Sequence, residues 1–150
     1  MRHLLLIFAL AGLPMTLIAQ DGQIVIEDLS AAELRAEIQK VQTEFFRVFN
    51  ISNTDDSLEI VCHTYVPTMS HISQEACEPQ FLIEARARNV EGYRNNTDEL
   101  LTPEQLRADQ RQGFERLTEA MNSVLRTNDY FRELNSVLQM LRGRLAELNG

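Results

Sequence analysis

Two cysteines and two histidines, Cys62, His63, His71 and Cys77, are the residues best suited to chemistry, and all four lie in one short stretch. Thiolate and imidazole groups are the usual ligands of zinc. In an antiparallel hairpin the paired cysteines point to one face. Because side chains alternate along a strand, His63 then points to the other face, while His71 shares the cysteine face. One regular hairpin cannot bring all four side chains together, so we predict a Cys62–Cys77 disulfide and no metal site.

The acidic residues form no catalytic pattern. Glu33 with Glu37, and Glu115 with Glu119, lie one helical turn apart, which is more typical of a solvated helix face than of an acid–base pair. Neither Glu-x-x-His nor His-Glu-x-x-His occurs, and there is no glycine-rich phosphate loop or nucleophile elbow. No CxxC motif supplies a resolving thiol for redox chemistry. The sequence therefore predicts no catalytic residue, no cofactor and no enzyme.

The first nineteen residues have the pattern of a secretory signal peptide. A charged start at Arg2 precedes an apolar run over residues 4–18, and the small residue Ala19 precedes the polar Gln20. The apolar run is shorter than the roughly 20 residues that a spanning helix needs. We expect cleavage after Ala19, no membrane span after cleavage, and a periplasmic or secreted protein.

Charge and length limit the partners and the number of domains. Residues 20–150 keep 13 basic and 22 acidic side chains, a net charge of −9. Such a chain repels phosphate backbones, so nucleic acid is not an expected partner. Its length suits one domain with a modest core. We expect a leader segment at 20–29, strand-like at 24–26, and a single helical domain at 30–150.

Helix signals recur in three regions. Ser30 and Glu33 form a capping-box pattern, and a helix with one apolar stripe should run from there to about Asn50. A second helix should begin near Glu78-Pro79, because proline suits the first helical turn. The third region begins at Thr102, again with a capping-box pattern. The stripe of the first region comprises Leu34, Ile38, Val41, Phe45 and Val48.

The third region has two apolar stripes that do not share one register. Joining them through Asn128 into one long helix over 103–149 requires a coiled-coil stammer. Alternatively the chain breaks at 127–129, where polar side chains can cap a new helix. The break is the favoured interpretation. The first stripe is Phe114, Leu117, Met121 and Val124, and the second is Phe131, Leu134, Leu138, Leu141, Leu145 and Leu148.

Residues 58–77 have a different character from the helical regions. Residues 58–66 are rich in β-branched and aromatic side chains, 67–70 read as a turn, and 71–77 as a second extended stretch. We therefore predict a mainly α fold, with three to four amphipathic helices and one disulfide-clipped β-hairpin inserted between the first and the second.

Four short motifs lie in and around the hairpin: Phe49-Asn50, residues 58–62, Thr68-Met69-Ser70-His71-Ile72 and Cys77-Glu78-Pro79-Gln80-Phe81-Leu82. Together they resemble a group of small exported proteins of Gram-negative bacteria. In that group a Cys-turn-Cys hairpin with a Gly-Ser-Arg-Ile-like centre leads into a Cys-x-Pro-x-Phe helix start. Met69 and His71 replace the glycine and the arginine. The resemblance implies a compartment and an architecture, and no activity.

Two kinds of function are compatible with these features. The leucine stripe near the C-terminus favours helix-to-helix association of the coiled-coil type, so a non-enzymatic binding or structural protein would act through helical surfaces. Its partner would be another protein or a second copy of itself. The alternative is an inhibitor that presents the loop 67–71 to an enzyme cleft, because a preorganised loop loses less entropy on binding.

Overall fold

The computed structural model describes residues 25–150, so the expected signal peptide lies outside the described residues. The mainly α fold with one inserted hairpin is confirmed. The described chain forms five α-helices, two short 3₁₀ turns and one antiparallel hairpin: α1 (Ala31–Ser52), α2 (Gln80–Arg94), α3 (Pro103–Asp109), α4 (Arg111–Thr127), α5 (Asp129–Asn149), η1 (Ile26–Asp28), η2 (Asp56–Leu58), β1 (Ile60–Tyr65) and β2 (Gln74–Pro79).

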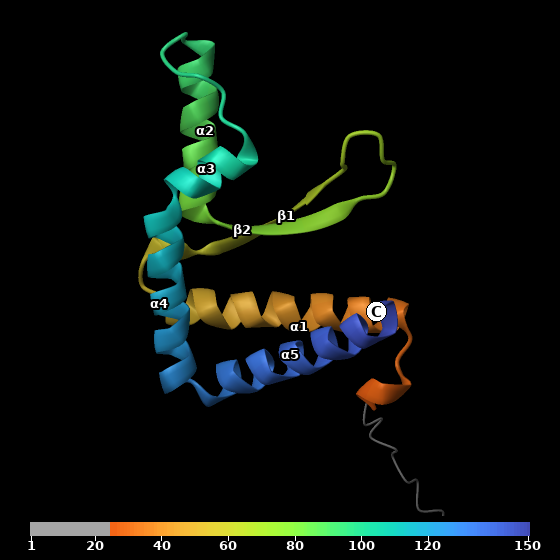
Figure 1. The fold of residues 1–150 in the computed structure, drawn as a ribbon. Coiled ribbons are helices and arrows are strands. Elements are labelled where there is room, and N and C mark those ends of the chain that lie inside the picture. Colours follow the sequence, from red (N-terminus) through yellow and green to blue (C-terminus); the bar gives the residue numbers. More distant parts are fainter. Residues whose placement is uncertain (1–24) are drawn as a thin grey trace, which may run out of the picture.

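Two long helices form the base of the molecule. Figure 1 shows α1 and α5 side by side and antiparallel, with α4 crossing one end of the pair. The hairpin extends over α1, and α2 rises away from the base with α3 beside it. The hairpin is therefore held between α1 and the start of α2, while its turn points away from the other elements.

Aromatic stacking fills the contact between α1 and α5. The rings of Phe45 and Phe131 stack with centroids 4.1 Å apart, and Phe49 lies at the same junction. The predicted stripe on the last helix is buried from Phe131 to Leu141, whereas Leu148 is exposed near the helix end. The stripe that predicted helix-to-helix association is thus largely used inside this chain.

Helix boundaries follow the capping signals. Ser30 and Glu33 form both hydrogen bonds of a capping box at the start of α1, and Thr102 and Gln105 form a second capping box at the start of α3. The break at 127–129 is confirmed, because the Asn128 Oδ1 accepts a hydrogen bond from the Phe131 N–H at 3.0 Å and starts α5.

One further bend, at Gln110, raises the helix count above the predicted three to four. It separates α3 from α4, and the Gln110 N–H still donates to the Leu106 carbonyl. Leu106 before the bend and Leu117 after it are both buried. The change of direction therefore serves the core around α2, which no local pattern indicates.

Four other details differ from the sequence prediction. Residues Ile26–Asp28 form a 3₁₀ turn rather than a strand, and α1 continues past Asn50 to Ser52. The second strand begins at Gln74 rather than residue 71. Pro79 ends that strand and precedes α2, instead of occupying its first turn. Pairing with Ile60 extends the strand to this proline and delays the helix.

None of the helices in residues 25–150 combines the length and the apolar character that crossing a bilayer would require.

Candidate functional site: the hairpin arm

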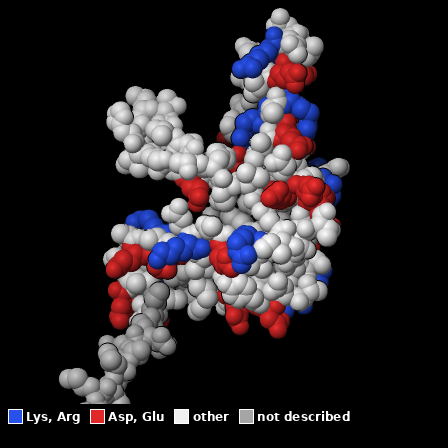
Figure 2. Space-filling model, turned by 180° about the vertical axis from the view of Figure 1, so that it is seen from behind, with Lys and Arg blue, Asp and Glu red and all other residues white. Residues whose placement is uncertain are grey.

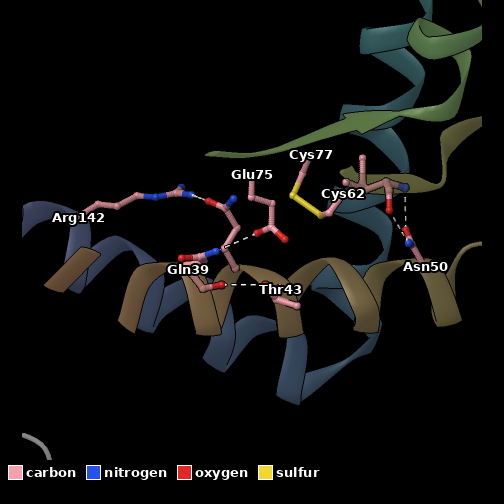
Figure 3. The surroundings of a disulfide bond; sticks show 9 residues. Gln39, Thr43, Asn50, Cys62, Glu75, Cys77 and Arg142 are labelled. Carbon is pink, nitrogen blue, oxygen red and sulfur yellow. Dashed lines mark hydrogen bonds between the residues drawn. A yellow bond between two sulfur atoms is a disulfide. The ribbon is translucent and has the colours of Figure 1, made fainter. Parts of the chain in front are cut away.

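The hairpin arm, residues 60–79, is attached to α1 at its base by one amide side chain. The Asn50 Oδ1 accepts a hydrogen bond from the Ile60 N–H, and its Nδ2 donates to the Ile60 carbonyl, both at 2.9 Å (Figure 3). Asn50 thereby occupies the place that a neighbouring strand would take at Ile60. Ile60 and its partner Pro79 are buried, so the base belongs to the core.

The Cys62–Cys77 disulfide ties the two strands together one pair further along the arm. These residues face each other in the register with a Cα–Cα distance of 4.0 Å, which confirms the predicted pairing. The bridge points from the hairpin towards α1 (Figure 3). Closing a loop of 15 residues is worth about 3 kcal/mol in the chain-entropy model.

An ion pair connects the end of β2 to α2. The two oxygens of Glu78 accept hydrogen bonds from both terminal nitrogens of Arg86, at 2.6 and 2.9 Å. These hydrogen bonds with Arg86 lower the pKa of Glu78. The contact fixes the direction in which α2 leaves the hairpin, so the arm is braced by α2 as well as by α1.

Farther out, the arm separates from α1. The Gln39 Nε2 donates to the Glu75 carboxylate at 3.3 Å, and an open groove of about 390 Å³ lies beside this contact. The groove has polar walls rather than a packed apolar seam. Its lining residues are Arg35, Ile38, Gln39, Gln42, Ser73, Gln74 and Glu75.

The outer part of the arm has no formal charge, although the whole chain has a net charge of −8. No Asp, Glu, Lys or Arg occurs from residue 60 to residue 74. Figure 2 shows this part as an uncoloured projection that stands clear of the charged body. Val66 is 57% and Ile72 72% exposed, and Met69 is fully exposed. The tip, defined as residues 66–73, therefore presents exposed apolar side chains on an uncharged segment of an acidic protein.

The turn at the tip holds Met69 in a rare backbone conformation. The Ser70 N–H donates to the Pro67 carbonyl at 3.0 Å, and Met69 between them has a φ of 65°. A non-glycine residue in this left-handed region costs about 1–2 kcal/mol, which glycine avoids. The chain thus has a large, fully exposed side chain at a position where glycine would be less strained.

The two histidines do not join the cysteines. His63 pairs with Ala76 on the opposite face from the disulfide, as predicted, and its ring lies 6.3 Å from that of Tyr65. His71 lies in the connecting loop rather than on a strand, so its predicted place on the cysteine face is wrong. In residues 25–150 no three His, Cys, Asp or Glu side chains are grouped so as to hold a metal ion.

The paired carboxylates have ordinary places on helix surfaces. Glu33 is bound to Ser30 in the capping box, and these hydrogen bonds lower its pKa. Glu37 pairs with Lys40 at 2.6 Å. Glu115 and Glu119 are exposed on α4. These four carboxylates therefore lie on the surfaces of α1 and α4.

Comparison of the chain with protein-family models, with curated proteins and with solved structures found no match. Asn50 appeared in the sequence analysis only as the expected end of the first helix and in the resemblance, not as a partner of the hairpin, and Arg86 had no role there. Their partners lie 10 and 8 residues away across a change of element, for which the local sequence gives no signal.

Proposed function

We propose that this protein is an exported, non-enzymatic binding protein whose hairpin arm places its tip in an apolar recess of a protein partner. The observation that supports this most directly is Met69, which is fully exposed at a φ of 65°. A strained residue at an exposed turn is a reasonable indicator of function, because its backbone cost is not recovered by packing.

Exposed apolar side chains lie closer together in the sequence on the arm than on the helices. One stretch of the arm, residues 65–72, has no Asp, Glu, Lys or Arg. It carries four of the large exposed hydrophobic side chains, Tyr65, Val66, Met69 and Ile72. The stripes on α1 and α5 are mostly buried against each other. Association through helical surfaces, the leading interpretation of the sequence, therefore has less exposed apolar surface to support it.

Export is supported by the disulfide and by the signal-like first nineteen residues. Disulfides persist in oxidising compartments, and an isolated two-stranded hairpin is marginally stable without such a bridge. A bridged arm is ordered before it meets its partner, so binding loses less conformational entropy. The disulfide thus fits both the proposed compartment and the proposed mode of binding.

Site-specific photo-cross-linking in the cell envelope tests this proposal. A photoreactive residue at position 69 should give a discrete adduct with another protein. The matched control is the same residue at Met140, which is 51% exposed on α5. Equal adducts at both positions, or none at 69, would contradict the role of the tip.

An enzyme among the captured partners would favour the inhibitor form of the proposal. The purified partner's activity should then fall on adding wild-type protein and be largely unaffected by Met69→Gly. The reason is that this variant keeps the turn, which glycine tolerates, and removes only the exposed side chain. If the partner's activity is unchanged when wild-type protein is added, the protein binds this partner but does not inhibit it.

A further inference from the structure

The outer edge of β1 can be read from the register of the hairpin. The N–H and carbonyl of Ile60 bond to Asn50, so they point away from β2. Main-chain groups of an antiparallel strand alternate in direction with a period of two residues. The N–H and carbonyl groups of Cys62 and Thr64 therefore point to the same outer side. In the part of the chain that the structure describes, β1 has β2 as its sole neighbouring strand.

The two edges of the hairpin differ in their protection against strand addition. In the same register the outward positions of β2 are Glu75, Cys77 and Pro79. A charge and a proline are the usual devices that prevent edge pairing. The β1 edge has no charge and no proline from Ile60 to Val66, and Asn50 blocks it at Ile60 alone.

We infer that two copies of this chain pair through their β1 edges, antiparallel about Thr64, and form a four-stranded sheet. In this register Thr64 lies opposite Thr64 of the second copy, and Cys62 lies opposite Val66. His63 then lies opposite Tyr65 on both sides of the two-fold axis. Aromatic cross-strand pairs stabilise antiparallel sheets, and the His63 and Tyr65 rings already neighbour each other within one arm.

Local charge does not oppose a second copy at this edge. Two chains of net charge −8 repel each other over most approaches. Contact between residues 60–66 of each copy places no like charges opposite one another. The paired stretch ends at Val66, before the turn residue Met69. Tyr65 and Val66 belong to this stretch and also to the exposed surface of the arm, whereas Met69 and Ile72 lie outside it. Cross-linking at Met69 and the Thr64 variants therefore test different residues, so a failure of the dimer is distinguishable from a failure of the proposed tip.

Substitutions at Thr64 test the pairing in the full mature chain, with the disulfide intact. Thr64→Lys puts two ammonium groups face to face on the two-fold axis. Within one hairpin the same lysine lies opposite Glu75, so it should not weaken the monomer. Thr64→Pro removes an outward N–H that β2 does not use. Thr64→Val is the control, because it keeps the strand propensity and the backbone.

Sedimentation velocity over a range of protein concentrations measures the monomer–dimer equilibrium of the wild type and of each variant. The wild type and Thr64→Val should associate to a dimer. Thr64→Lys and Thr64→Pro should weaken the dimer at least about tenfold, since each affects both halves of the symmetric pair. Amide hydrogen exchange of β2 checks that the hairpin remains folded in each variant. A wild type that is monomeric at every concentration would overturn the inference. A dimer that persists in Thr64→Lys would show that another surface forms it.

Discussion

Replacing Met69 by glycine should stabilise the protein. Its backbone lies at a φ of 65°, where an L-residue costs about 1–2 kcal/mol relative to glycine. Glycine also frees the unfolded chain, which lowers the free energy of unfolding by about 0.4–1 kcal/mol. The Met69 side chain is fully exposed, so its removal forfeits no packing. The free energy of unfolding should therefore rise by about 0.5–1 kcal/mol for Met69→Gly.

Urea unfolding of the oxidised protein, followed by far-ultraviolet circular dichroism, measures this change. Thr68→Gly is the neighbouring control, because Thr68 has no positive φ and should lose about 0.4–1 kcal/mol. Asn96→Gly is the second control. Asn96 has a φ of 55°, but asparagine tolerates that region better than methionine, so its gain should be smaller. Exchange of the Ser70 amide, which donates within the turn, reports the same effect locally.

One result for the Met69→Gly and Thr68→Gly variants would contradict the expected strain at Met69. If Met69→Gly loses as much stability as Thr68→Gly, the backbone at position 69 is not strained. The argument that the chain keeps a costly residue for its exposed side chain would then fail. A stability gain combined with unchanged partner capture would refute the binding role while leaving the backbone argument intact.

Three further changes test other parts of the molecule. Cys62→Ser with Cys77→Ser should lower the free energy of unfolding by roughly 2–4 kcal/mol; hydrogen exchange should speed up over 58–90 and change little over 131–148. Gly113→Ala should lower the free energy of unfolding in urea by about 1 kcal/mol, because the added Cβ would lie 2.7 Å from the Phe81 ring. Gly143→Ala is the matched control: it has open space around it and should raise the free energy of unfolding by about 0.5–1 kcal/mol. Hydrogen bonds with Arg86 lower the pKa of Glu78 in the folded state, so the ionised carboxylate stabilises the fold fully above the unfolded value of 4.5. This stabilisation is lost as the pH falls through the lowered pKa. When unfolding is measured across an acid series, the difference in unfolding free energy between wild type and Glu78→Gln should therefore shrink below about pH 4.5.

Local signals predicted the parts of the fold that depend on neighbouring residues. The capping boxes at Ser30 and Thr102 depend on side chains three residues apart, and both formed as predicted. The break before Asp129 followed from a polar side chain at Asn128 and from two stripes out of register. The cysteine pair followed from chemistry and compartment rather than from any fold.

Tertiary contacts decided the rest. Pro79 has the right type for a first helical turn, yet pairing with Ile60 keeps it in the strand. The bend at Gln110 allows leucines on both sides to reach the core around α2. Asn50 looked like a helix terminator, whereas it sits inside α1 and bonds to a strand. In each case a contact outside the local window outweighed the residue's own preference.

The arrangement of the arm divides stability and binding between its two ends. Asn50, the Cys62–Cys77 bridge and the Glu78–Arg86 pair all act at the base or on the first few strand pairs. The bridge alone contributes about 3 kcal/mol in the chain-entropy model, more than the roughly 1–2 kcal/mol that Met69 costs in the turn. Strain at the tip is therefore offset without any packing there. An exposed apolar side chain can then remain ordered and free for a partner.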